Sequence, residues 1–187
     1  MILILMGKTA SGKDSIAKEL CRNRQLARIV TYTTRPPRPN EIDGKDYHFT
    51  SRSDFQDKIK HNFFVEWKSY QTADGEWLYG TAAEDLWSNS VLILTPQGIR
   101  DFYKYCRHEA RVFYVVASDK TIMERLVQRG DDPTEAHRRL EHDNEDFAHV
   151  DDLVDYTILN EDRQISEVAE DILNYWNLEK ERLYGKR

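Results

Sequence analysis

The sequence predicts an α/β fold with a central, mostly parallel sheet flanked by helices. Strand and helix patterns alternate along the chain, which is typical of a parallel sheet with crossover helices. The first strand pattern is uniformly apolar and runs directly into a glycine-rich turn and an amphipathic helix. Two stretches, about 33–81 and 130–150, break the alternation and are expected to be insertions. The core of a single domain spanning 1–187 is therefore expected at 1–32 and 82–187.

The expected strands are short apolar runs, of which the first, ILILM, has no polar position and should be buried on both faces. They lie at 2–6, 28–32, 91–95, 111–117 and 156–159, with two further extended pieces in FFVEWKSY and EWLYGT. The expected helices show apolar residues at helical spacing. They lie at 14–23, 52–61, 82–88, 97–107 and 119–129, with a last helix from about Ile165 to Trp176. In 119–129, Ile122, Leu126 and Val127 are expected on one side.

Composition argues against several classes of protein. A chain of 187 residues with 40% hydrophobic and 32% charged residues is an ordinary globular domain. The net charge of −6 argues against a general nucleic-acid binder. No apolar run approaches the ~18 residues of a membrane span, and the start is too short for a signal peptide. Cys21 and Cys106 form no CxxC pair, as expected of reduced thiols in a cytoplasmic protein.

The stretch MGKTASGKDS, residues 6–15, matches the phosphate-binding pattern GxxxxGK(S/T) at Gly7, Gly12 and Lys13. Backbone N–H groups at a helix start have no intrahelical partner and can surround a phosphate. The strand before the turn and the helix after it strengthen this interpretation, which predicts a P-loop NTPase fold. The residues expected to bind the phosphates of a nucleoside triphosphate are Gly7, Lys8, Thr9, Ala10, Ser11, Gly12, Lys13, Asp14 and Ser15.

Asp14 stands where the pattern places a hydroxyl that ligates the magnesium of the bound triphosphate. An acid in the first turn of a helix is favourable by itself, and this is the alternative role. Beside a triphosphate, however, a carboxylate is repelled unless a cation lies between them. We therefore expect Asp14 to be a metal ligand for the Mg²⁺ that accompanies ATP.

The stretch TTRPPRPNEIDGKDYHF, residues 33–49, is expected to be a long irregular loop because its three prolines exclude a helix interior or a central strand. Its residues match T-(S/T)-R-xx-(K/R)-xx-(D/E)-xx-G-xx-Y-x-(F/Y), the pattern of guanylate kinases, at every fixed position. The matching residues are Thr33, Thr34, Arg35, Arg38, Glu41, Gly44, Tyr47 and Phe49. FVEWKSY, LYGT, ERLVQRG with RRL, and LNED resemble further stretches of that family, so the resemblance covers nearly the whole chain.

The resemblance implies phosphoryl transfer from ATP to GMP or dGMP, with segment 33–81 binding the acceptor. It implies that GMP contacts Thr31, Arg35, Arg38, Tyr47, Glu66, Tyr79, Gly80 and Thr81, and that Asn160 lies on the adenine side of ATP. Planar guanidinium groups suit the phosphate dianion, and one carboxylate can accept from both donors of guanine. The alternatives are solvated loop charges for Arg35 and Arg38 and a polar strand-face residue for Glu66.

The resemblance also implies a lid at about 130–150. The cations expected to act in catalysis are Lys13, Arg38, Arg129 and Arg139, while roles for Arg125 and Arg138 are less defined. The lid histidines His137, His142 and His149, with Asp143, match no tight set of metal ligands and are expected on a solvated face.

The chain departs from the family where ILTPQGI carries Ile93 and Thr95 at two usually acidic positions. We hypothesise that Asp14 replaces this lost metal support and that the loss of the carboxylate at Thr95 loosens guanine selection. The alternatives to a GMP kinase are therefore a broader (deoxy)nucleoside monophosphate kinase and a catalytically weak binding module. A monomer or homodimer is expected, without nucleic-acid or membrane partners.

Overall fold

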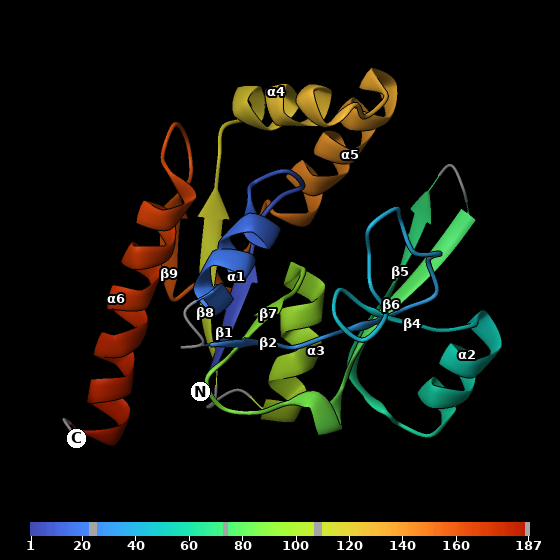
Figure 1. Ribbon diagram of the computed structural model, residues 1–187, viewed down its shortest axis with the longest axis horizontal. Helices are drawn as coiled ribbons and strands as arrows, with labels where there is room; N and C mark the ends of the chain where they lie inside the picture. The colour runs from blue at the N-terminus through green and yellow to red at the C-terminus, as the bar shows by residue number, and fades with distance from the viewer. Residues whose placement is uncertain (23–25, 73–74, 107–109, 186–187) are drawn as a thin grey trace. The chain divides into compact units, whose positions relative to one another are not determined.

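Two sheets organise the chain (Figure 1). The computed structural model describes residues 1–22, 26–72, 75–106 and 110–185. Within these ranges the chain divides into two units. The first unit comprises Met1–Arg28, Asn89–Pro96 and Glu109–Arg187, and the second comprises Ile29–Ser88 and Gln97–His108.

The first unit contains the predicted parallel sheet. Its strands are β1 (Ile2–Met6), β2 (Ala27–Arg28), β7 (Ser90–Ile93), β8 (Ala110–Val116) and β9 (Tyr156–Leu159). Their order is β2-β7-β1-β8-β9, and every pairing is parallel. All five residues of β1 are buried, as expected of a central strand with no polar position.

The described residues of the first unit contain the helices α1 (Lys13–Arg22), α4 (Asp119–Arg129), α5 (Pro133–Asp146) and α6 (Ile165–Tyr184). The apolar faces of α1 and α6 share one core with alternate residues of β1 (Figure 1). Trp176 of α6 is the largest of the fully buried side chains in the described chain. Helices α4 and α5 form a smaller cluster around Ile122, Leu126 and Leu140. The lid expected at 130–150 thus contains a helix with its own apolar anchor.

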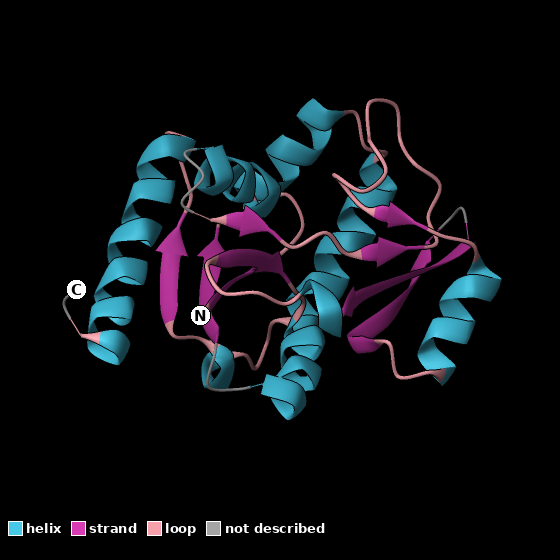
Figure 2. Cartoon of the chain, turned by 60° about the horizontal axis from the view of Figure 1, so that its bottom comes forward, coloured by secondary structure: helices cyan, strands magenta, loops and turns pink. Residues whose placement is uncertain are grey.

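The second unit contains a four-stranded sheet in the order β4-β3-β6-β5. Its elements are β3 (Tyr32–Thr33), β4 (His48–Phe49), α2 (Arg52–Lys60), β5 (Phe64–Thr72), β6 (Gly75–Ala82) and α3 (Pro96–Cys106). Strands β5 and β6 form an antiparallel pair, clear in Figure 2, and β3 pairs antiparallel with β6. Phe55 of α2 stacks on Phe64 with ring centroids 4.4 Å apart, which anchors the helix to the sheet.

Three expectations about elements were wrong. The strand predicted at 28–32 is divided, because Arg28 ends β2 in one sheet and Tyr32 begins β3 in the other. The helix predicted at 82–88 is only a 3-10 turn at Ala83–Asp85. Val127 was predicted on the same side of α4 as Ile122 and Leu126, but it is 59% exposed. The apolar cluster with α5 covers a narrow face of α4 that includes Ile122 and Leu126 and leaves Val127 outside. The C-terminal ends predicted for the helices at 14–23 and 97–107 lie outside the described residues.

Among the described residues, none of the helices combines the length and the apolar character needed to cross a bilayer. Neither Cys21 nor Cys106 is part of a disulfide.

Candidate functional site

The phosphate loop connects the carboxyl end of β1 to the start of α1. Open parallel sheets bind ligands at this end of their strands. The backbone reverses through two residues with positive φ, Ala10 at 51° and Gly12 at 101°. The turn is closed by Ser11 N donating to Lys8 O at 3.2 Å, and α1 begins with Ile16 N donating to Gly12 O at 3.0 Å. The predicted loop residues are therefore brought together as one turn at a helix N-terminus.

Lys13 folds its side chain over this loop. Its Nζ donates to Lys8 O at 2.7 Å and lies 3.5 Å from Ser11 Oγ. Burial lowers the pKa of Lys13 to about 8, while the carboxylates of Asp14 and Asp143 act in the opposite direction. A cation held over the loop in this way suits an anion with more than one charge.

The loop is braced from behind by two side chains. Asn160 is 0% exposed, and its Nδ2 donates to Ser11 O at 2.7 Å. A Cβ added at Gly12 would lie 2.3 Å from this nitrogen, so Asn160 and the glycine fit each other. Arg125 Nη1 donates to Ala10 O at 3.3 Å, and its Nη2 donates to Asn160 O at 2.9 Å. Arg125 was given no firm role from the sequence, because its target carbonyls are 115 and 35 residues away.

Two neighbouring residues of α5 contact the front of the loop. Asp143 Oδ2 accepts from Thr9 N at 2.5 Å. Lys8 Nζ pairs with Asp119 Oδ1 at 2.9 Å and also bonds Asn144 Oδ1. Burial raises the pKa of Asp143. The sequence contains no signal for the contact of Asp143 with the loop, because its partner is 134 residues away.

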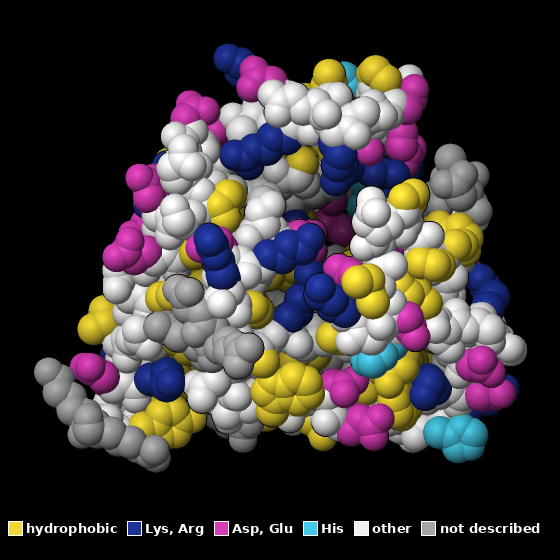
Figure 3. Space-filling model, in the orientation of Figure 1, with side chains coloured by type: hydrophobic (Ala, Val, Ile, Leu, Met, Phe, Trp, Pro, Cys, Tyr) yellow, Lys and Arg dark blue, Asp and Glu magenta, His cyan; other side chains and the backbone are white. Residues whose placement is uncertain are grey.

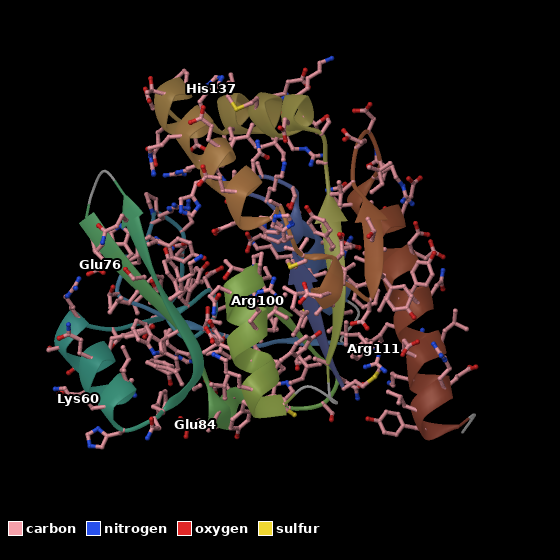
Figure 4. All side chains as sticks on the ribbon, turned by 180° about the vertical axis from the view of Figure 1, so that it is seen from behind. Lys60, Glu76, Glu84, Arg100, Arg111 and His137 are labelled. Carbon is pink, nitrogen blue, oxygen red and sulfur yellow. The ribbon has the colours of Figure 1, made fainter. Side chains whose placement is uncertain are left out.

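The lid arginines are paired with acids of their own segment. Arg129 Nε donates to Asp131 at 2.9 Å, and Arg139 Nε donates to Glu135 at 2.9 Å. Glu135 also accepts from Arg138, and these guanidinium groups, Arg138 first, lower its pKa to about 2. His137 lies on the exposed surface of α5, at the labelled end of the helix in Figure 4.

The residues of the second unit that were predicted to hold the acceptor phosphate gather around Arg35. Its guanidinium makes a two-pronged pair with Glu41, at 2.8 and 3.0 Å, and its Cζ lies 5.4 Å from the centre of the Tyr47 ring. The Tyr47 and Tyr79 rings are 5.9 Å apart. Glu41 also accepts from Arg38 N at 2.7 Å, which fixes the turn of the loop. The structure thus brings Arg35, Tyr47 and Tyr79 together and adds Glu41, a residue that the motif contained without a role.

Glu66 is the buried acid of the second unit. It is 8% exposed, and its Oε1 accepts from Thr81 Oγ1 at 2.5 Å. Burial raises the pKa of Glu66 to about 7, although the Thr81 hydroxyl acts to lower it. Tyr79 and Thr81 are two residues apart on β6 and therefore share one face of the strand. Glu66 lies opposite Thr81 on the neighbouring strand β5, so its carboxyl and the Tyr79 side chain belong to the same face of the sheet.

The remaining predicted acceptor residues are placed by the backbone. Thr31 precedes β3, and its carbonyl accepts from His48 N at 2.9 Å. Gly80 is packed so closely that an added Cβ would lie 2.9 Å from the Phe64 ring. A glycine is therefore required there by packing.

Asp14 lies in the first turn of α1, directly after the loop. Its side chain is 66% exposed, and its carboxylate pairs with Arg28 at 3.2 Å. Within the described ranges, no three His, Cys, Asp or Glu side chains are grouped to hold a metal ion by themselves. A single exposed carboxylate is nevertheless a sufficient protein contribution for Mg²⁺, which is commonly held by one or two carboxylates with phosphate oxygens and water. The donor set therefore fits a metal that arrives with a nucleotide.

Acidic and basic side chains are interspersed on the face shown in Figure 3. Because the net charge of the chain is −6, an anionic ligand has to be held by local groups of Lys and Arg side chains.

Comparisons with known proteins show which family the chain resembles. The guanylate kinase family model matches residues 1–175. A guanylate kinase of Wolinella succinogenes is 35% identical over 89% of this chain and 79% of its own length. One from Xylella fastidiosa is 33% identical over 86% of this chain and 80% of its own length. The crystal structure of guanylate kinase from Anaplasma phagocytophilum superposes with a TM-score of 0.68 at 26% identity, over 96% of this chain and 85% of that one.

Proposed function

We propose how this chain, which belongs to the guanylate kinase family and transfers a phosphoryl group from ATP to GMP, divides that reaction among its residues. The donor is assigned to the first unit and the acceptor to the second. The observation that carries this assignment is the buried carboxyl of Glu66 beside the Thr81 hydroxyl, on the strand face that also bears Tyr79.

On the donor side, the residues from Gly7 to Ser15 surround the ATP phosphates with backbone N–H groups. Lys13 supplies a partly buried ammonium to the terminal phosphates, and its position over the loop supports that role. Asn160 acts from behind the loop on the adenine side. Arg129 and Arg139 exchange their present carboxylate partners for phosphate oxygens when the lid closes, and they stabilise the charge on the transferred group.

On the acceptor side, Arg35, Arg38, Tyr47 and Tyr79 hold the phosphate of GMP. The pairing of Arg35 with Glu41 orients its guanidinium before the ligand arrives, which reduces the entropy lost on binding. Arg38 completes the phosphate contacts and neutralises charge during transfer.

Base selection rests on Glu66, with Thr31, Gly80 and Thr81 shaping the pocket. The ionised carboxylate accepts from both the N1–H and the amino group of guanine, whereas adenine offers an acceptor at N1 and is repelled. The Thr81 hydroxyl donates to one oxygen of the Glu66 carboxylate and thereby fixes the orientation of the whole carboxylate.

Mg²⁺ is the proposed metal, and Asp14 is the proposed protein ligand. The ion would neutralise charge on the ATP phosphates. The exposed carboxylate of Asp14 at the start of α1 would hold it or one of its waters. Arg28 keeps this carboxylate in place in the free protein. Ile93 and Thr95 offer no carboxylate at their positions, so the selection of guanine is proposed to rest on Glu66 without support from them.

We further propose that the enzyme works in nucleotide metabolism in the cytoplasm, as a monomer or homodimer. Cys21 and Cys106 are not joined in a disulfide, which suits a reducing compartment.

A coupled assay of ADP release with ATP, Mg²⁺ and each of GMP, dGMP, AMP, CMP and UMP tests the proposal. Turnover with GMP and dGMP alone is expected. Glu66→Gln should lose most of this turnover, while Glu84→Gln, which removes an exposed acid of the same unit (Figure 4), should keep it. Equal turnover of GMP and AMP by the unmodified enzyme would refute guanine selection by Glu66.

A further inference from the structure

A carboxylate of the protein itself, that of Asp143, accepts a hydrogen bond from the backbone of the phosphate loop. Asp143 Oδ2 accepts from the backbone N of Thr9, one of the loop groups assigned to ATP. The same carboxylate acts electrostatically on Lys13. In a phosphate loop this lysine serves the β- and γ-phosphates. The carboxylate therefore stands at the end of the loop that the terminal phosphates of ATP need.

A second contact holds the same turn of α5 in place. Lys8 bridges Asp119 of α4 and Asn144 of α5, and Asn144 Nδ2 also lies 3.3 Å from Asp119 Oδ2. Asn144 follows Asp143 directly in the sequence. The two contacts together fix the C-terminal turn of α5 against the loop, so the bond from Thr9 to Asp143 is part of a docked arrangement.

The other cations assigned to the reaction are also paired with internal carboxylates, but locally. Arg129 pairs with Asp131 two residues away, Arg139 with Glu135 four residues away, and Arg35 with Glu41 six residues away. These pairs order a side chain within its own segment. The bond from Thr9 to Asp143 spans 134 residues, so it ties the lid to the loop.

We propose that Asp143 is an affinity-determining residue of the donor site, whose carboxylate occupies part of the triphosphate site and must leave before ATP binds. A carboxylate and a terminal phosphate repel each other and cannot share one amide and one ammonium group. Asp143 therefore weakens binding of the donor and selects ligands with enough negative charge to displace it. Arg139 lies on the same face of α5 as Asp143, one helical turn earlier. The departure of Asp143 from the loop therefore also releases the part of α5 that carries Arg139.

The inference rests on the proposed role of the loop as the ATP site. Asp143→Asn removes the charge but keeps an acceptor, and Asp143→Ala removes both. Glu141→Gln, an exposed position on the same helix, is the matched control because it removes one negative charge without touching the loop. Calorimetry with inorganic tripolyphosphate, a non-hydrolysable ATP analogue and GMP separates phosphate binding, donor binding and acceptor binding.

Both Asp143 variants are expected to bind tripolyphosphate and the ATP analogue about three- to tenfold more tightly, because both remove the competing negative charge and Asp143→Ala also removes the competing hydrogen bond. GMP binding should be unchanged, and Glu141→Gln should differ from the unmodified protein by less than about twofold. Weaker or unchanged binding by the Asp143 variants would overturn the inference, and so would an equal gain in Glu141→Gln. If the unmodified protein bound GMP but neither polyphosphate ligand, the proposed function of the loop itself would fail.

The backbone amide of Thr9 provides a second measurement that needs no variant. Its NMR resonance in the free protein should follow the ionisation of Asp143 as the pH is lowered. Saturating tripolyphosphate should abolish this dependence, because the carboxylate has then left the amide. A pH dependence that persists in the complex would show that Asp143 and the phosphates do not compete.

Discussion

The acid dependence of GMP binding is a direct consequence of the burial of Glu66. The pKa of this carboxyl is about 7 in the free protein. Only the ionised form accepts from both donors of guanine, so binding must first remove the proton in a fraction of the molecules. With that pKa, about nine-tenths of the molecules are ionised at pH 8 and about one-tenth at pH 6. GMP affinity should therefore fall about tenfold between pH 8 and pH 6, which is about 1.4 kcal/mol.

Calorimetric titration of GMP at half-unit steps of pH measures this effect. The phosphate of GMP has a pKa near 6 and contributes its own dependence, which Glu66→Gln retains while losing the carboxyl. The ratio of the affinities of the two proteins isolates Glu66. Thr81→Val should raise the pKa of Glu66 and move the fall to higher pH, whereas Thr81→Ser should not. A ratio that stays constant from pH 6 to 8 would refute the reasoning.

The burial of Glu66 affects stability in the opposite direction: GMP affinity should rise with pH, whereas the contribution of Glu66 to the free energy of unfolding should fall. The folded protein holds the Glu66 proton up to a pKa of about 7, while the unfolded chain releases it near 4.5. The folded state therefore binds more protons between these values, so the free energy of unfolding contributed by this group is lost as pH rises from 4.5 to 7. Glu66→Gln should consequently be more stable than the unmodified protein at pH 8 in urea unfolding. A less stable variant would contradict the burial of the charge.

Three further outcomes are expected. Gly12→Ala should lower ATP affinity more than tenfold and leave GMP affinity intact in calorimetry. The φ angle of Gly12 is 101°, and the new Cβ would lie 2.3 Å from Asn160 Nδ2. An equal loss of affinity for both ligands would indicate general unfolding instead. Since the pKa of Lys13 is about 8 and its ammonium form binds phosphate, ATP affinity should fall about tenfold for each pH unit above 8; a constant affinity up to pH 9.5 would contradict this. Arg111→Met should lower the free energy of unfolding by about 2 kcal/mol in urea, because Arg111 (Figure 4) pairs at 2.7 Å with the buried carboxylate of Glu179; no change would show that the remaining partners suffice.

Local patterns in the sequence were enough to predict much of this protein. The apolar run ILILM, the glycines of the loop and the helix after them specify β1, the turn and α1, because each depends on residues within a few positions. The arginine-rich motif of 33–49 likewise predicted its residues as a group, and the structure joins Arg35 to Tyr47. The family was predicted from these motifs, and the comparisons confirmed it.

The errors arose where the outcome depends on distant partners. The stretch 28–32 has a continuous strand pattern, yet β7 pairs with its first residue and β6 with its last. Nothing in five consecutive residues specifies which strand lies beside them. Val127 fits a helical spacing, but the area that the neighbouring helix covers decides how wide the buried stripe is.

The chemical state of the site is also a tertiary property. The sequence supplied a glutamate at 66 and a lysine at 13, and only the burial of both side chains brings one pKa to about 7 and the other to about 8. The sequence placed Asp143 in the predicted lid at 130–150, and only the fold brings it to the amide of Thr9, 134 residues away. Residue types and spacings determine which groups are present, whereas desolvation and long-range contacts determine which of them are charged, occupied or free to bind.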